Sequence, residues 1–362
     1  MRTITPSDSG LSNVEQTVYH SEMHKSDSHS GSQFTSRLLT VFATLGVVTL
    51  LAAACGDDAD DSETSGSDTP TVVVTTNILG DVVENLLGDA ATVETVMPTG
   101  AAPHEFRASA QQVATIGDAE VLVVNGAGIE EGLLDPIEAA ETDGVPVCVA
   151  IDAVEPVDFE EGEHADEEGE HSDEEHADEE GEHGHEHEGA DPHFFTDPAR
   201  MAAAAGDLTD CILAAAPALD TEGVRSSADA YVAQLEDLDE EVEALLAAVP
   251  DERRVLVTNH EVFGYFADRY GFEVAGAILP VSTQSEASAS QLAELAELVE
   301  EKGVPAVFAD TSSPNQLAEA LAAEVGEVEV AELFSESLGP DGGETYIAMV
   351  RTNAERIADA LG

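Results

Sequence analysis

The stretch SSADAYVAQLEDLDEEVEALLAAV, residues 226–249, lies between two halves of the chain that have similar sequence patterns. Its apolar residues recur at spacings of four and three, in the order Tyr231, Leu235, Leu238, Val242, Leu245 and Val249. This period predicts one continuous helix of about 24 residues, roughly 36 Å long, which Pro250 ends. We therefore expect a stiff helix, and not a flexible hinge, between the two halves, although an ordinary packed surface helix would have the same pattern.

Short apolar, β-branched runs alternate with helical segments on both sides of this helix. The expected strands are 71–76, 91–97, 119–125 and 145–151 in the first half and 254–259, 272–279, 306–310 and 328–334 in the second. Such alternation predicts parallel sheets that helices cover on both faces. The predicted fold is α/β, with two (β/α) lobes, a long rigid helix between them and a binding cleft at their interface. The limits that follow are 70–220 for the N-terminal lobe, 221–250 for the connecting helix and 251–362 for the C-terminal lobe.

The first 69 residues have the composition of export and linker segments. A polar tail (1–33) precedes an apolar run that ends in LLAAAC at Cys55, and the acidic stretch 56–69 follows. Residues 34–55 resemble a bacterial lipoprotein signal, in which the cysteine receives lipid and becomes the mature N-terminus. An uncleaved anchor helix is the alternative. Both interpretations place the body of the protein outside the cytoplasm and attach it to a membrane, and the linker is too polar to fold.

The charge of the chain excludes one class of partner. The sequence has 76 acidic residues against 12 Lys and Arg, for a formal net charge of −64. Nucleic acid is therefore not an expected partner, because phosphate binding needs clustered basic side chains. The excess of carboxylates fits adaptation to high external salt and fits simple solubility equally well.

Two cysteines remain once Cys55 is assigned to lipid. An oxidising exterior permits a disulfide between Cys148 and Cys211. Two buried free thiols are an equally good interpretation, because the sequence does not show whether the two residues meet.

Histidine placement is the main indication of function. Outside the N-terminal tail and the tract 160–188, the chain has three histidines: His104 in PTGAAPHEF, His193 in DPHFFTDP and His260 in VLVTNHEVFGYF. Each follows an expected strand, and Glu336 in LFSES follows another. Ligands bind beyond the carboxyl ends of parallel strands, so these side chains should line the cleft, two from each lobe. Three imidazoles and one carboxylate form a complete zinc shell, and Glu105, Asp191 or Glu261 could orient the rings.

The acidic tract that precedes DPHFF is a second candidate for metal binding. It carries six histidines among Glu and Asp: His164, His171, His176, His183, His185 and His187. Its composition predicts a loop without a fold of its own, within the range 160–189, and suits weak, exchangeable binding of divalent metals near the cleft. A solvated acidic loop with no specific role is the alternative.

No enzymatic motif competes with this metal site. The segment HEVFG lacks the second histidine of HExxH, and GAGIEEG lacks the third glycine of the dinucleotide-binding fingerprint. We therefore expect a binding protein and not an enzyme. Two alternatives from other classes stay open, a secreted zinc-dependent hydrolase and an adhesin that contains a structural metal.

Several motifs together resemble the metal-binding lipoproteins that serve zinc and manganese ABC importers, over about 71–362. They are PTGAAPHEF with SAQQ (109–112), VNGAGIE (124–130), DPHFFTDP (191–198), TNHEVFGYFADRYG (258–271) and ELFSESLG (332–339). The acidic, histidine-rich loop before DPH resembles the zinc branch.

This resemblance implies a receptor that delivers metal to a membrane permease. It implies that His104, His193 and His260 are ligands, and a histidine at 260, where manganese members tend to carry Glu, favours Zn²⁺ over Mn²⁺. The fourth ligand in the family is usually Asp, so either Glu336 or a water molecule takes that place here. The family also implies a rigid helix between the lobes and modest closure on binding. We expect a monomer.

Overall fold

The computed structural model describes residues 69–157, 190–278, 289–312, 316–326 and 328–362. The predicted signal with Cys55 and the tract with its six histidines lie outside these ranges. Within the ranges, no helix has both the length and the apolar character needed to cross a membrane.

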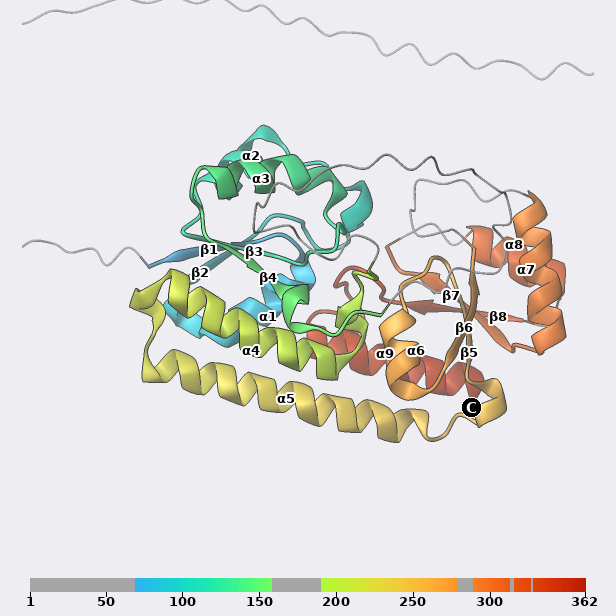
Figure 1. Ribbon diagram of the computed structural model, residues 1–362. Helices are drawn as coiled ribbons and strands as arrows, with labels where there is room; N and C mark the ends of the chain where they lie inside the picture. The colour runs from blue at the N-terminus through green and yellow to red at the C-terminus, as the bar shows by residue number, and fades with distance from the viewer. Residues whose placement is uncertain (1–68, 158–189, 279–288, 313–315, 327) are drawn as a thin grey trace, which may run out of the picture. The chain divides into compact units, whose positions relative to one another are not determined.

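The N-terminal lobe is built on a parallel sheet of four strands. Their order is β2-β1-β3-β4, with β1 at Thr71–Val74, β2 at Thr92–Thr95, β3 at Val121–Val124 and β4 at Val147–Val149. Helices cover both faces, α1 (Asn77–Leu87) and α4 (Pro198–Ala215) on one, α2 (Ala110–Gly117) and α3 (Leu134–Thr142) on the other (Figure 1). Alternate residues of β3 explain this arrangement. Val121 and Val123 pack in the core with α1 and α4, while Leu122 and Val124 pack with α2 and α3.

The C-terminal lobe repeats the same strand order. Its parallel sheet is β6-β5-β7-β8, with β5 at Val255–Thr258, β6 at Glu273–Ala277, β7 at Ala306–Asp310 and β8 at Glu329–Leu333. One face packs against α7 (Ala289–Lys302) and α8 (Gln316–Val325), and the other against α6 (Gly264–Tyr270) and α9 (Tyr346–Leu361). The expected strands are thus present in both lobes, each shorter than or equal to its apolar run.

Helix α5 (Glu222–Leu246) is the predicted connection between the lobes. Its 25 residues span roughly 38 Å, and it begins four residues earlier than the apolar period indicated because the Thr221 side chain caps Val224 N–H. It packs against α1 and α4 of the first lobe and α9 of the second. Asp239, buried on α5, accepts hydrogen bonds from Arg269 Nε and Tyr270 Oη of α6, both at 2.9 Å. The helix is therefore fixed to both lobes.

The two cysteines whose state the sequence left open form a disulfide. Cys148 of β4 and Cys211 of α4 are bonded, with their Cα atoms 5.9 Å apart. The bond is possible because α4 lies directly against β4.

Short 3-10 turns occupy Gly88–Ala90, Pro103–Glu105, Glu131–Leu133, Ala150–Ala153, Phe194–Thr196, Pro217–Leu219 and Asp251–Arg253.

Candidate metal centre

The two N-terminal-lobe histidines lie on loops beyond the strand ends. His104 sits in the 3-10 turn Pro103–Glu105, between β2 and α2, and His193 directly precedes the turn Phe194–Thr196. Both side chains are buried, with 4% and 0% exposure. The backbone N–H of His193 donates to Asp191 Oδ1 at 2.9 Å, which fixes the DPH segment locally.

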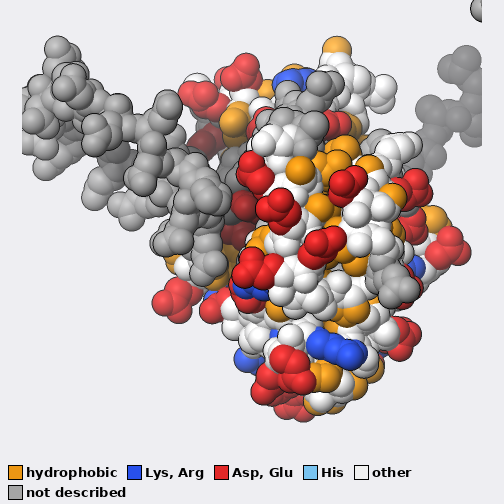
Figure 2. Space-filling view, turned by 90° about the vertical axis from the view of Figure 1, so that its right-hand side faces the viewer, with side chains coloured by type: hydrophobic (Ala, Val, Ile, Leu, Met, Phe, Trp, Pro, Cys, Tyr) orange, Lys and Arg blue, Asp and Glu red, His pale blue; other side chains and the backbone are white. Residues whose placement is uncertain are grey.

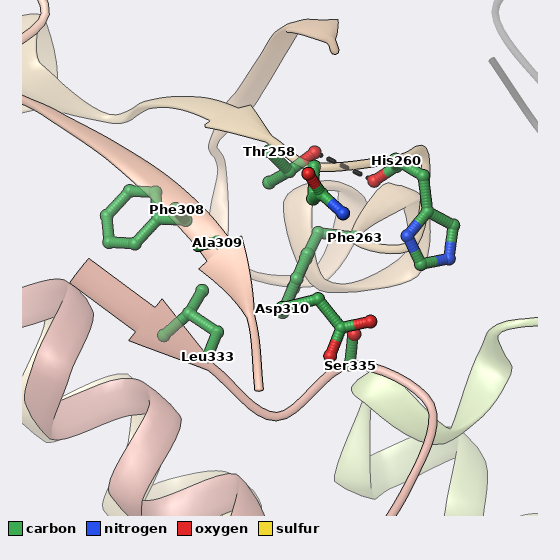
Figure 3. A pocket seen from close by; sticks show the side chains of 9 residues that line it. Thr258, His260, Phe263, Phe308, Ala309, Asp310, Leu333 and Ser335 are labelled. Carbon is green, nitrogen blue, oxygen red and sulfur yellow. Dashed lines mark hydrogen bonds between the residues drawn. The ribbon is translucent and has the colours of Figure 1, made fainter. Parts of the chain in front are cut away.

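The C-terminal lobe contributes His260 just after β5 and Glu336 just after β8, each 1% exposed. Thr258 Oγ1 donates to the His260 carbonyl at 2.8 Å and so holds the turn at the end of β5 (Figure 3). On the other strand, Asn353 of α9 bonds both the N–H and the carbonyl of Phe334, at 2.9 and 2.6 Å. Rigid elements therefore position both side chains.

The four predicted residues lie close together, with the Glu336 carboxylate between the imidazoles. The ring centroids of the three histidines are 5.7 to 6.5 Å apart. Glu336 Oε1 lies 3.1 Å from His104 Nε2 and 3.3 Å from His193 Nε2, and Oε2 lies 3.3 Å from His260 Nε2. Two residues from each lobe are thus brought together in a buried position.

These contacts fit a bound cation. A tetrahedral zinc shell with bonds of about 2.0–2.1 Å places its donor atoms about 3.3–3.4 Å apart, close to the distances between Glu336 and the imidazoles. Within the described part of the chain, His104 Nε2, His260 Nε2 and Glu336 Oε2 are buried polar atoms that make no hydrogen bond. Buried polar atoms are nearly always satisfied, so these three atoms around Glu336 fit the coordination of a cation. The donor set suits a divalent transition metal.

The far nitrogens of two rings explain why Nε2 faces inward. His193 Nδ1 is 2.7 Å from Asp191 Oδ1, and His104 Nδ1 is 3.3 Å from Glu131 Oε1. A carboxylate on Nδ1 keeps the proton there and leaves the Nε2 lone pair for metal. Asp191 was one of the predicted ring partners. For His104 the partner is Glu131 and not Glu105, because the turn Pro103–Glu105 leaves Glu105 exposed.

The third predicted ring partner, Glu261, is half-buried beside the site. Burial raises the pKa of its carboxyl, and the charge of Asp191 raises it further, while the charges of His260 and His193 oppose this. Glu261 thus belongs to the electrostatic surroundings of the centre.

Mutual attraction sets the protonation of the metal-free centre. Burial lowers the pKa of His193, but the charge and hydrogen bond of Asp191, with those of Glu336, outweigh burial and raise this pKa to about 9. Burial raises the pKa of Glu336, but the three facing imidazoles outweigh it and hold this pKa well below its usual value. At neutral pH these shifts favour a buried His193 imidazolium beside the Glu336 carboxylate.

Besides Glu131, a potential metal ligand near the centre was not predicted from the sequence. Asp310, the last residue of β7, is 3% exposed and forms a group with His260 and Glu336 whose potential ligand atoms all lie within 4.8 Å of one another. The signal was available, since AVFAD ends in a polar residue at the carboxyl end of a strand, as the other candidate segments do.

Comparison with known proteins identifies the family of the chain. The model of the family described as zinc-uptake complex component A, periplasmic, matches residues 72–360. The zinc-binding protein TroA of Treponema pallidum is 31% identical over 336 residues, which cover 90% of this chain and 98% of TroA. The manganese-binding lipoprotein MntA of Halalkalibacterium halodurans is 28% identical over 319 residues, which cover 87% of this chain and 96% of MntA.

Solved structures agree on the fold. The periplasmic zinc-binding protein TroA of T. pallidum matches with a TM-score of 0.69 and 29% identity, covering 81% of this chain and 99% of the TroA chain. A manganese-bound periplasmic metal-binding protein of Candidatus Liberibacter asiaticus has the same fold at a TM-score of 0.68 and 19% identity, covering 81% of this chain and all of the other. With a family model that spans most of its length, the chain belongs to the periplasmic zinc-uptake component A family, the substrate-binding proteins of metal ABC transporters.

Proposed function

We propose that this protein is the extracytoplasmic receptor that captures Zn²⁺ and delivers it to the permease of an ABC importer. Proteins of its family are metal-binding receptors of such importers and are not enzymes. The observation that carries the choice of zinc is the convergence of three buried imidazole Nε2 atoms on Glu336. In this proposal His104, His193, His260 and Glu336 are the four ligands.

The donor set favours Zn²⁺ over Mn²⁺. The relatives include a zinc-binding and a manganese-binding protein, so similarity alone does not select the metal. Imidazole suits zinc, whereas manganese prefers carboxylate, carbonyl and water oxygens, and any N/O site binds Mn²⁺ more weakly than Zn²⁺. Three nitrogens and one carboxylate are therefore a zinc shell, and the carboxylate offsets part of the charge of the cation.

The arrangement supports a carrier and not a catalyst. A catalytic zinc keeps one coordination position open for water, whereas four protein donors close a tetrahedral shell. The four side chains are also at most 4% exposed, which leaves a substrate no access in this state. Neither the hydrolase nor the adhesin alternative has support from the family.

Metal binding at the interface of the lobes would make the metal-bound receptor differ in structure from the metal-free one. His104 and His193 come from one lobe, and His260 and Glu336 from the other, so a cation bound to all four would bridge the lobes. Because α5 packs on both lobes, closure should be small. The loaded and empty proteins would then differ near the centre more than in the position of whole lobes.

Attachment to the membrane completes the proposal. The sequence assigns lipid to Cys55, and relatives such as MntA are lipoproteins. A monomeric receptor on a lipid tether would stay close to its permease. Acidic side chains are spread over the face in Figure 2 with few Lys or Arg between them, a surface that disfavours binding of nucleic acid. The six histidines of the tract 160–188 are proposed as weak accessory metal ligands.

Zinc titration in competition with a chromophoric chelator tests the assignment. The purified full chain should bind one Zn²⁺ tightly, and His193→Ala should lose this tight binding. A control variant with all six tract histidines replaced by Ala should keep it, since those residues are not ligands of the buried centre. Tight, one-to-one binding by His193→Ala that equals the parent would refute the proposed site.

A further inference from the structure

Asp310 is a buried carboxylate in the C-terminal lobe, next to the proposed zinc ligands. It lines a small cavity of about 10 Å³ together with Asn259, His260 and Ser335 (Figure 3). None of the residues that line this cavity is Lys or Arg. Two carboxylates, Asp310 and Glu336, therefore share one buried group with His260, and an arrangement of this kind calls for a cation.

Unpartnered atoms on the same side point to a ligand. His260 Nε2 and Glu336 Oε2 face each other at 3.3 Å without a hydrogen bond. Ser335 Oγ and Asn259 Oδ1, 3% and 5% exposed as residues, also have no hydrogen-bond partner in the described structure. These four atoms lie around the carboxyl ends of β5 and β8, where Asp310 ends β7 between them.

Glu336 divides its oxygens between two sets of donors. Its Oε1 faces His104 and His193 of the N-terminal lobe, and its Oε2 faces His260. Asp310 forms a group of potential ligands with His260 and Glu336. Glu336 thus links two groups of potential ligands, one with His104 and His193 of the N-terminal lobe and one with His260 and Asp310 of the C-terminal lobe.

Hydrogen bonds and its place at a strand end fix the position of the Asp310 carboxylate. Ser312 donates to it twice, from N–H to Oδ1 at 2.7 Å and from Oγ, which lies 2.8 Å from either carboxylate oxygen. An ionised carboxylate offers about four lone-pair positions, so these bonds orient it and still permit metal coordination. The residue also ends a strand that is paired on both sides, which makes it a rigid donor.

We propose that Asp310 supplies a fifth donor to the cation, and that this second carboxylate is what allows the centre to hold Mn²⁺ as well as Zn²⁺. The proposal rests on the proposed function and deepens it. Zinc is satisfied by four donors, whereas manganese prefers more ligands and more oxygen. Asp310 is therefore a residue that broadens metal selectivity.

Asp310→Asn in the full chain removes the charge and keeps an oxygen that can accept from Ser312. Glu332→Gln is the matched control, because Glu332 is an exposed carboxylate on the neighbouring strand β8. Competition titrations should show that Asp310→Asn weakens Mn²⁺ binding on the order of tenfold or more and Zn²⁺ binding clearly less, while Glu332→Gln changes neither. Equal weakening of both metals, or no change in either, would overturn the proposal.

A second measurement on the parent protein does not depend on the variant folding. Loaded with Co²⁺, the parent should give the weak visible absorption of a five-coordinate ion, and Asp310→Asn should give the stronger absorption of a four-coordinate one. A parent spectrum of the four-coordinate type would also overturn the role of Asp310. Failure of the parent to bind one metal ion at all would instead refute the proposed function, so the two outcomes are distinct.

Discussion

Asn77 of α1 joins the lobes beside the proposed ligand Glu336, and its removal should weaken both stability and zinc binding. Asn77 is 7% exposed, and its side-chain amide donates to Ser337 Oγ at 2.9 Å and to the Pro98 carbonyl at 3.1 Å. Its Oδ1 accepts from Leu338 N–H at 2.7 Å. Ser337 and Leu338 follow Glu336 directly in the chain, so this one amide fixes the loop that carries the carboxylate.

The size of the effect follows from the bonds lost. Asn77→Ala removes three hydrogen bonds, each worth about 0.5–1.5 kcal/mol net, and leaves the buried Leu338 N–H without an acceptor. We expect the free energy of unfolding to fall by about 2–4 kcal/mol. Zinc affinity should also fall, on the order of tenfold, because the loop that positions Glu336 loses its attachment to the other lobe.

Urea unfolding of the metal-free protein and a zinc competition titration measure the two effects. Asn85→Ala is the matched control, since Asn85 lies on the same helix, is exposed, and bonds only locally to the Asp81 carbonyl among the described contacts. It should cost less than about 1 kcal/mol and leave zinc affinity unchanged. If Asn77→Ala matched Asn85→Ala in both assays, the amide would not hold the loop and the reasoning would be wrong.

Two further predictions concern His193 and its ring partner. Because the pKa of His193 is about 9 in the folded metal-free protein and near 6.5 when unfolded, the folded state binds more protons between these values. The free energy of unfolding, measured in urea, should therefore be highest below pH 6.5 and fall by on the order of 3 kcal/mol as the pH rises to 9. The His193→Gln variant should lack this fall. An increase in the stability of the parent protein over the same pH range would contradict the prediction. Asp191→Asn should weaken zinc binding by about 10–100-fold in a competition titration, because the ring loses the carboxylate that orients it. Exposed Glu105→Gln should have no effect, and equal affinities for the two variants would rule out the orienting role.

Much of the fold was predictable because its signals are local. The spacing of apolar residues gave α5 within a few residues at each end, and continuous β-branched runs gave the eight described strands. The ends of the elements were predicted less accurately, since a capping residue such as Thr221 extends a helix beyond its apolar period. The disulfide between Cys148 and Cys211 needed the packing of α4 on β4, which no local pattern contains.

The candidate site was predictable in its main residues and incomplete in its surroundings. Rare histidines after strands identified His104, His193 and His260, because the carboxyl ends of parallel strands share one edge. Glu131 and Asp310 were missed. Acidic residues are so common in this chain that the sequence does not indicate which of them belong to the site. Their role depends on which neighbours they contact in the folded protein.

The order of apolar and polar residues by itself determined two parallel-sheet lobes and a stiff helix between them, and the placement of three histidines after strands predicted a metal site. Only the tertiary structure decided that these side chains meet at 3.1 to 3.3 Å, which carboxylates turn the rings, and that Asp310 stands beside them. The physical reason is one of range. Secondary structure follows from neighbours along the chain, whereas a coordination shell is set by distances between atoms that packing brings together from both lobes.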